Sequence, residues 1–275
     1  EVHDTASCCK VSDGNTTVEP LAGALGAEIS GVDLNELDDA AVAEIRRALL
    51  ENNVVFFREQ DFTPATQMAF GQKFGDLNRH SYVKGLDAYP DVFRIVKEPT
   101  DAHHFGNSWH TDLAYEEEPA MATILYGMDI PDAGGDTMFA DLAAAYDTLP
   151  GSMKERLNGL RVRQQYRWSR DRAHPEARWN LLNDTEREKT PEVIHPLVRT
   201  HPETGRKGLY ISNAVSTGVK DIVGMEADAS RALIDELFTH SQDPRFQIRY
   251  KWRVGDLVVW DNRTLMHKAT TNVLP

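Results

Sequence analysis

Apolar and polar positions in the first third of the chain follow two periods, and each period predicts a different element. Residues 18–34 are glycine-punctuated and partly alternating, which predicts two small strands joined by a turn. From residue 38, apolar residues recur at three- and four-residue steps, which predicts a helix. The apolar run 53–57 is typical of a buried strand, and residues 63–74 predict a second helix that begins with a threonine cap and a proline.

Beyond residue 120 the pattern is mostly that of β-strands, with helical stretches between them. The expected strands are 121–126, 137–139, 208–212, 246–252 and 257–260, and the expected helices are 142–160 and 227–240. Several short strands with helices grouped before and between them predict a mainly β, mixed α+β fold. The architecture that fits is a small β-sandwich or barrel with helices packed on one side.

No change in composition divides the chain. Of its 275 residues, 41% are hydrophobic and 27% are charged, which is enough apolar material for one large core. The sequence has no Ser/Gly/Pro-rich linker and no internal repeat, so we expect one domain over residues 18–275. Residues 1–17 are polar without an apolar stretch, which predicts a disordered arm or a vector-derived remnant rather than a secretory signal.

Charge, apolar stretches and cysteines argue against several function classes. The net charge of −13 argues against nucleic acid as a partner, because phosphate binding needs a clustered basic surface. No apolar stretch approaches the roughly 20 residues that cross a bilayer, so no membrane partner is expected. The two cysteines, Cys8 and Cys9, are adjacent and lie in the predicted arm. We therefore expect no disulfide framework or thiolate metal site, and a reducing, cytoplasmic location.

One His-x-Asp sequence, His110-Thr-Asp112, is a candidate metal-binding pair. On a strand, residues i and i+2 point to the same side and can hold one ion. Two imidazoles and one carboxylate bind Fe(II) on one face and leave three coordination positions free. Trp109, Leu113 and Tyr115 provide an apolar frame that favours a strand in a barrel wall over a solvated turn, and His267 follows a strand-like run that could supply the second imidazole.

Several motifs occur together and in order along residues 18–275. Together they resemble the family of taurine dioxygenase and chlorophenoxyacetate dioxygenase. The motifs are the opening segment 25–34, Trp109-His-Thr-Asp112, Gly134-Gly-Asp-Thr137, the segment 195–202, and Trp260-Asp-Asn-Arg263 with His267.

The resemblance implies a double-stranded β-helix, or jelly roll, with helical additions. It implies Fe(II) held by His110, Asp112 and His267, which are then both the metal ligands and the catalytic group. The co-substrates it implies are 2-oxoglutarate and O₂, with Thr137 at the distal carboxylate of 2-oxoglutarate. The expected activity is hydroxylation of a small, anionic substrate such as a sulfonate, alkyl sulfate or aryloxy acid, with release of succinate and CO₂, by a homo-oligomer (dimer or tetramer).

The same resemblance implies a set of substrate contacts around the metal. Val215 departs from the phenylalanine that is frequent in taurine-using relatives, which predicts a pocket of different shape and a substrate other than taurine. His195 and His201 belong to a family motif. The two His-x-Glu pairs, at His201 and His174, are expected to be structural, because a proline lies between the would-be ligands. The expected substrate contacts are His80, Tyr82, Asn107, Tyr115, Tyr166 and Val215.

The family's arginine for the 2-oxoglutarate carboxylate has no counterpart after His267. Lys268 is adjacent to the ligand and points to the other face of a strand. An unpaired buried carboxylate is costly, and a fork-shaped arginine is its natural partner. We therefore expect the native chain to continue beyond Pro275 with an arginine-bearing strand, and residues 268–275 to form an open, partly unpaired edge. The other candidates for this role are Arg167, Arg170 and Arg263.

Two hypotheses from other functional classes are alternatives to the oxygenase. A non-catalytic metal-binding jelly roll would keep the three ligands and need no co-substrate pocket. A zinc hydrolase could use the same ligands, but the sequence lacks a general-base glutamate beside a ligand histidine. Succinate formation that depends on Fe(II) separates the oxygenase from both.

Overall fold

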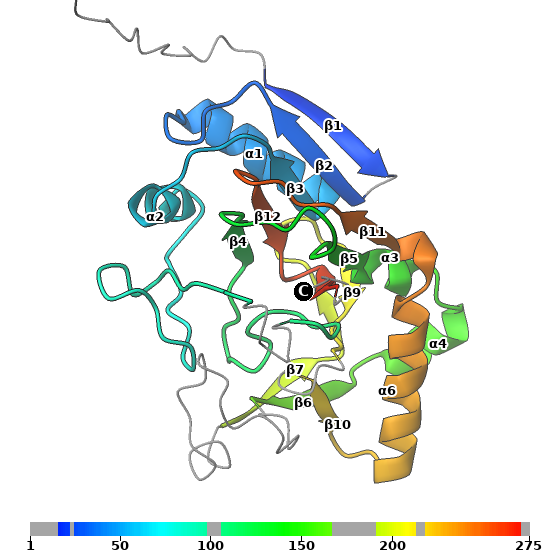
Figure 1. The fold of residues 1–275 in the computed structure, drawn as a ribbon. Helices are drawn as coiled ribbons and strands as arrows, with labels where there is room; N and C mark the ends of the chain where they lie inside the picture. Colours follow the sequence, from blue (N-terminus) through cyan, green and yellow to red (C-terminus); the bar gives the residue numbers. More distant parts are fainter. Residues whose placement is uncertain (1–15, 23–24, 98–105, 167–190, 213–217, 271–275) are drawn as a thin grey trace, which may run out of the picture.

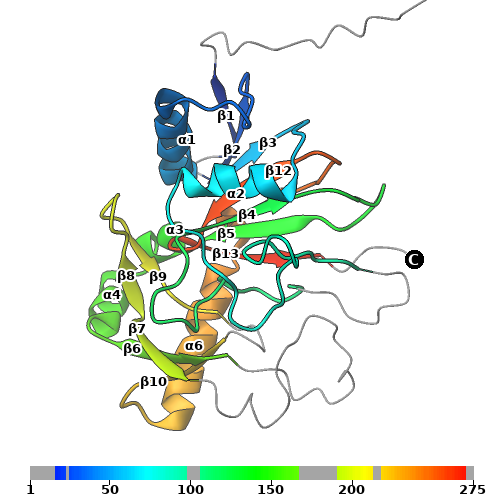
Figure 2. The same cartoon turned by 90° about the vertical axis from the view of Figure 1, so that its left-hand side faces the viewer.

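Two facing β-sheets form the core of the described structure, and helices and two further small sheets, β10-β6-β7 and β8-β9, lie around them (Figures 1 and 2). The structure is a computed structural model that describes residues 16–22, 25–97, 106–166, 191–212 and 218–270. Among these residues no helix is long and apolar enough to cross a membrane.

The larger sheet has the strand order β1-β2-β3-β12-β4. Its pairs are antiparallel except β2 with β3. The central strands β3 and β12 are buried at every residue, because both faces of the sheet are covered, and their sequences are accordingly continuous apolar runs. The bounds are β1 Thr17–Ala22, β2 Leu25–Ser30, β3 Val54–Phe57, β4 Ala122–Tyr126 and β12 Leu257–Asp261.

The smaller sheet has the order β11-β5-β13 and lies against the larger one. Its strands are β5 Thr137–Asp141, β11 Gln247–Tyr250 and β13 Leu265–Ala269. Aromatic side chains fill the space between the sheets: the Phe56 ring stacks on Tyr250 at 4.0 Å and meets Phe139 edge-on at 6.0 Å. The two facing sheets are the jelly-roll core that the sequence predicted, and the helices are its additions.

Two capped helices cover the outer face of the larger sheet (Figure 2). They are α1 Asp39–Asn52 and α2 Pro64–Gln72. The side chain of Asp38 accepts a hydrogen bond from the backbone N–H of Ala41, and Thr63 and Thr66 form a reciprocal capping box. The first helix start was predicted from the apolar period that begins at residue 38, and the second from the cap and proline at Thr63 and Pro64.

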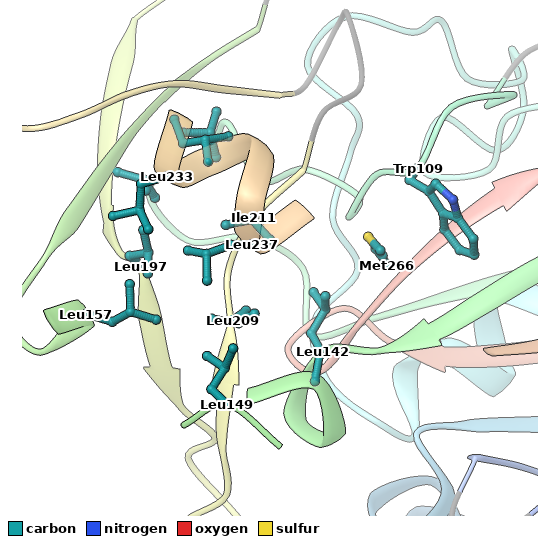
Figure 3. Close-up of a cluster of buried hydrophobic side chains, with 14 of the residues drawn as sticks. Trp109, Leu142, Leu149, Leu157, Leu197, Leu209, Ile211, Leu233, Leu237 and Met266 are labelled. Carbon is teal, nitrogen blue, oxygen red and sulfur yellow. The ribbon is translucent and has the colours of Figure 1, made fainter. Parts of the chain in front are cut away.

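The outer face of the smaller sheet is covered by a second group of elements. It contains α3 Leu142–Asp147, α4 Gly151–Leu157, α6 Ala227–Ser241 and the short helix η1 Pro244–Phe246. Its strands are β6 Arg161–Gln165, β7 Glu192–Pro196, β8 Val198–Thr200, β9 Lys207–Leu209 and β10 Val219–Ile222. Figure 3 shows their shared apolar cluster, with Trp109 and Met266 at the side nearest the smaller sheet. These two residues precede His110 and His267, so this cluster anchors the backbone on which both histidines lie.

The single helix expected over 142–160 is wrong. The chain forms two helices there, α3 and α4, separated at Pro150. Proline has no N–H to donate and disfavours helical geometry at the residue before it, so the first helix cannot continue through Leu149.

The structure contradicts one expectation about the strands around the histidines and part of a second. His110 makes only an isolated β-bridge to His267, and the chain turns immediately afterwards, with Leu113 at a φ of 53°. The predicted open edge is paired in its described part: Ala269 N–H donates to the carbonyl of Gly106 and Thr270 N–H to that of Asp136. The remainder of that edge, 271–275, lies outside the described residues.

Candidate metal centre and active site

The structure brings His110, Asp112 and His267 together at one end of the space between the sheets. One potential ligand atom from each residue lies within 4.8 Å of the other two. The same carboxylate oxygen of Asp112, Oδ1, is 3.5 Å from Nε2 of His110 and 3.7 Å from Nε2 of His267. Three donor atoms therefore converge on one point from one side.

Backbone and side-chain bonds fix the His110 imidazole in one tautomer. Its backbone N–H donates to the carbonyl of His267 at 3.0 Å, and the N–H of His267 donates back at 2.8 Å. Its Nδ1 lies 2.7 Å from the carbonyl of Ser108. A carbonyl only accepts, so Nδ1 carries the proton and the Nε2 lone pair is left for a metal. A Cβ on Gly106 would come within 3.3 Å of the ring, at a φ of +69°, so glycine is needed there.

Aromatic rings position the second imidazole. The His267 ring lies 4.6 Å from that of Trp260 and 6.1 Å from that of Phe139. Its Nδ1 is buried without a hydrogen-bond partner among the described residues. Ring packing, rather than hydrogen bonding, holds this ligand in place.

Burial and mutual charge set the protonation states. Burial lowers the pKa of His267 to about 3, so this imidazole is neutral. Burial alone would raise the pKa of Asp112, but the neighbouring imidazoles and the Thr123 hydroxyl outweigh it and hold that pKa well below its usual range. Burial alone would lower the pKa of His110, but the Asp112 carboxylate outweighs it and the net shift is upward. The ionised Asp112 carboxylate beside the neutral His267 imidazole favours binding of a cation.

These donors fit a divalent first-row metal ion. Two imidazole nitrogens and one carboxylate oxygen on one side of a site are typical of Fe(II) oxygenases, which need adjacent open positions. The polar atoms of His110 and Asp112 that face away from this point are occupied, Nδ1 by Ser108 and Oδ2 by Thr123. The two side chains are thus oriented for a metal before one binds.

Thr137 lies on the same face of the smaller sheet as His267. Its strand partner, Ala269, is two residues beyond His267. Phe139 pairs with His267 and Thr137 with Ala269, and side chains alternate along a strand. The indole N–H of Trp252 donates to the Thr137 hydroxyl oxygen at 2.9 Å. Because that oxygen already accepts a bond, its own proton can be donated to a group bound beside the metal centre.

Comparison with known proteins agrees with this geometry. Residues 17–273 match the family described as taurine catabolism dioxygenase TauD, TfdA family. The chain belongs to this family. It is a 2-oxoglutarate-dependent dioxygenase, and Fe(II), 2-oxoglutarate and O₂ are the cofactors of the family.

Three relatives illustrate the range of the family. An alpha-ketoglutarate-dependent 2,4-dichlorophenoxyacetate dioxygenase of Cupriavidus pinatubonensis is 33% identical over 93% of this chain and 92% of its own length. An alpha-ketoglutarate-dependent sulfonate dioxygenase of Saccharomyces cerevisiae is 32% identical over 94% of this chain, which spans 64% of that relative. A crystal structure of a taurine dioxygenase from Burkholderia xenovorans is 36% identical, covers 94% of this chain and 85% of that chain, and has a TM-score of 0.75.

Four of the expected substrate contacts of this dioxygenase form one cluster. The Tyr82 and Tyr166 rings stack at 4.2 Å, the Tyr115 and Tyr166 rings meet at 4.8 Å, and the Tyr115 hydroxyl lies 3.1 Å from Nε2 of His80. Asn107 is exposed and outside this cluster, and position 215 lies outside the described residues.

The tautomer of His80 determines which way the Tyr115 proton points. Nδ1 of His80 accepts from the backbone N–H groups of Tyr82 and Val83, at 3.0 and 3.1 Å. Burial lowers the pKa of His80, so the ring is neutral and its single proton lies on Nε2. That N–H donates to the Tyr115 oxygen, and the hydroxyl proton of Tyr115 has no acceptor among the described residues.

Other motif residues of the dioxygenase are structural. Nε2 of His201 bonds Asp261 at 3.1 Å, as expected for a histidine outside the active site. Arg263 bonds Asp261 and Glu203, so its guanidinium is not available for 2-oxoglutarate. Lys268 lies over the Trp109 ring at 4.8 Å, which confirms that it points away from the metal face. Arg167 and Arg170 lie outside the described residues.

Sequence reasoning missed three polar residues around the site. Thr123 bonds Asp112, Asn262 bonds Thr123, and Trp252 bonds Thr137. The place of Asn262 in the Trp260-Asp-Asn-Arg263 motif was a usable signal for its role. No sequence pattern marks Thr123, which is an ordinary strand threonine until β4 is paired with β12.

Asp112→Ala should weaken Fe(II) binding by more than about 100-fold, because even outer-shell changes at metal sites cost 10–100-fold. Turnover should be abolished, while the circular dichroism spectrum stays that of the wild type. The measurement is iron content after dialysis against a graded chelator. Wild-type iron content in the variant would contradict the assignment of this ligand.

Proposed function

We propose that this dioxygenase uses Fe(II), held by His110, Asp112 and His267, to hydroxylate a C–H bond of a small anionic organic substrate. One O₂ supplies both oxygen atoms, one to the substrate and one to the succinate formed as 2-oxoglutarate loses CO₂. The observation that carries the proposal is the convergence of two imidazole nitrogens and one carboxylate oxygen within 4.8 Å. The metal supplies O₂ activation and co-substrate chelation when bound, and the protein holds the ligands and orients the substrate.

Thr137 is the proposed contact for the distal carboxylate of 2-oxoglutarate. Its place beside His267 puts it on the metal side of the smaller sheet, and the Trp252 indole leaves its hydroxyl proton free to donate. A neutral hydroxyl cannot balance a buried carboxylate by itself, so we also propose that a cationic side chain pairs with this carboxylate.

The aromatic cluster supports an anionic substrate. Burial raises the pKa of Tyr115, so this hydroxyl remains a donor. His80 N–H fixes the Tyr115 oxygen as an acceptor, which leaves one buried O–H without an acceptor among the described residues. A buried donor of this kind is satisfied by a ligand oxygen that carries negative charge. Sulfonates, alkyl sulfates and aryloxy acids, which include the substrates named for two relatives, provide such an oxygen.

The proposed reaction predicts a specific metal dependence. Fe(II) with ascorbate should support succinate formation from 2-oxoglutarate, and Zn(II), Co(II) or Ni(II) should bind at the same ligands and inhibit, since they cannot run the Fe(II) redox cycle. Succinate is measured by mass spectrometry, with Asp112→Ala as the control. Turnover with Zn(II) and none with Fe(II) would favour a hydrolase, and iron uptake without succinate would favour a non-catalytic metal protein.

Thr137→Val should raise the Kd of 2-oxoglutarate by about 10-fold or more, because a hydrogen bond to a charged group contributes roughly 1.5–3 kcal/mol. Thr137→Ser keeps the hydroxyl and should stay within a few-fold of the wild type. The Kd is measured by calorimetry under nitrogen on the metal-loaded protein. An unchanged Kd in Thr137→Val would exclude Thr137 from the co-substrate site.

Tyr115→Phe should raise the KM of an anionic substrate by about 10-fold or more, for the same physical reason. The substrate is first found in a screen of sulfonates, alkyl sulfates, aryloxy acids and amino-acid derivatives. The control is succinate formation without substrate, which should not change. If KM were equal in both proteins, the Tyr115 proton would not meet the substrate.

A further inference from the structure

We infer that Trp260, Asn262 and Thr123 form a one-way chain of hydrogen-bond donors that restricts Asp112 to a single metal-binding oxygen. The Trp260 indole N–H donates to Oδ1 of Asn262 at 3.1 Å, and the Asn262 amide N–H donates to the Thr123 hydroxyl at 2.8 Å. Thr123 then donates to Oδ2 of Asp112 at 2.7 Å. The chain ends on the carboxylate oxygen that does not face the imidazoles.

The chemistry of the first member fixes the direction of the whole chain. An indole N–H can only donate, so the atom of Asn262 that faces it must be the carbonyl oxygen. The Asn262 NH₂ group therefore faces Thr123, whose oxygen must accept. The Thr123 proton is then directed to Asp112, which as an ionised carboxylate only accepts. None of these three residues can exchange its donor and acceptor roles without losing one of the hydrogen bonds.

Strand register brings these residues together. Trp260 of β12 lies opposite Thr123 of β4, and the backbone N–H of Asn262 donates to the carbonyl of Met121 at 2.9 Å, which extends the pairing by one step. Trp260 and Asn262 are buried. This chain of hydrogen-bond donors therefore lies on the edge of the larger sheet that faces the metal centre, and not on a loop.

Trp260 also links two of the three ligands. Its ring packs at 4.6 Å against the His267 imidazole, while its N–H begins the chain to Asp112. A shift of this side chain changes the angle of one ligand and the hydrogen bonding of the other. The two ligands are held by one side chain, although Asp112 and His267 are far apart in the sequence.

The consequence concerns the number of open coordination positions. A carboxylate with a free second oxygen can rotate and bind a metal through both oxygens. That would occupy a position which, under the proposed function, the keto acid or O₂ requires. By holding Oδ2, Thr123 would keep Asp112 bound to the metal through Oδ1 alone and would leave the other positions open. Thr123 and Asn262 are thus positioning residues, and this inference rests on the proposed metal centre.

The test replaces the Thr123 hydroxyl and leaves the shape of the side chain. Thr123→Val is nearly isosteric and β-branched, and Thr123→Ser keeps the hydroxyl as the matched control. Co(II) is titrated anaerobically into the metal-free proteins, and its visible absorption reports both affinity and coordination. 2-Oxoglutarate is then titrated into each Co(II) form. None of these readouts needs turnover.

Thr123→Val should bind Co(II) about 10–100-fold more weakly than the wild type, with an altered Co(II) spectrum and weaker 2-oxoglutarate binding. Thr123→Ser should restore all three to within a few-fold. Asn262→Leu, a second variant in case Thr123→Val does not fold, should change the spectrum in the same direction with a smaller loss of affinity, because Thr123 then loses its orientation.

The outcomes separate this inference from the proposed function. If the wild type took up no Co(II) at Asp112, the metal centre would be wrong and the inference would fall with it. If the wild type bound Co(II) and both Thr123→Val and Asn262→Leu matched it in affinity, spectrum and 2-oxoglutarate binding, the metal centre would stand and the positioning chain alone would be overturned.

Discussion

The reciprocal pair of backbone hydrogen bonds between His110 and His267 is the interaction on which the active site depends. It joins the segment before Asp112 to the last strand of the smaller sheet, although the two histidines lie in distant parts of the chain. Once this pair forms, both imidazoles lie side by side at 4.3 Å between ring centroids, and the turn after His110 directs Asp112 toward them. The metal centre is therefore a product of strand closure, and apolar packing around Trp109 and Met266 provides the free energy that maintains it.

Burial of polar groups is the cost of this arrangement, and hydrogen bonds with defined direction offset it. Asp112 is held by Thr123, His110 by Ser108 and Thr137 by Trp252, each through a bond whose donor can be assigned from chemistry alone. In each case the bond leaves one lone pair or one proton directed toward the reaction space. His267 is the exception, since aromatic rings hold it and its Nδ1 is without a partner among the described residues. The Trp260 and Phe139 rings bury the His267 imidazole, and burial keeps this ligand neutral.

Much of the fold and the three ligands could be predicted from the sequence, because they depend on local patterns. The apolar period from residue 38 and the cap at Thr63 mark helix starts, and the motif around His110 is distinctive only in the company of the other family motifs. The break at Pro150 was also readable, and the predicted helix 142–160 ignored it. What could not be predicted depends on register between distant strands, as for Thr123 and Asn262, or on a tautomer set by backbone geometry, as for His80. The domain limits, the homo-oligomer and the cytoplasmic location stay predictions.

The central claim is that three ligands on one side of the ion leave adjacent positions for a chelating keto acid. Anaerobic titration of 2-oxoglutarate into the Fe(II)-loaded protein tests it most directly, because the Fe(II)–keto acid chelate has a weak visible absorption band. The account predicts that this band grows to saturation at one 2-oxoglutarate per bound iron. Stoichiometric binding of 2-oxoglutarate without the band, or no binding at all by the iron-loaded protein, would contradict it.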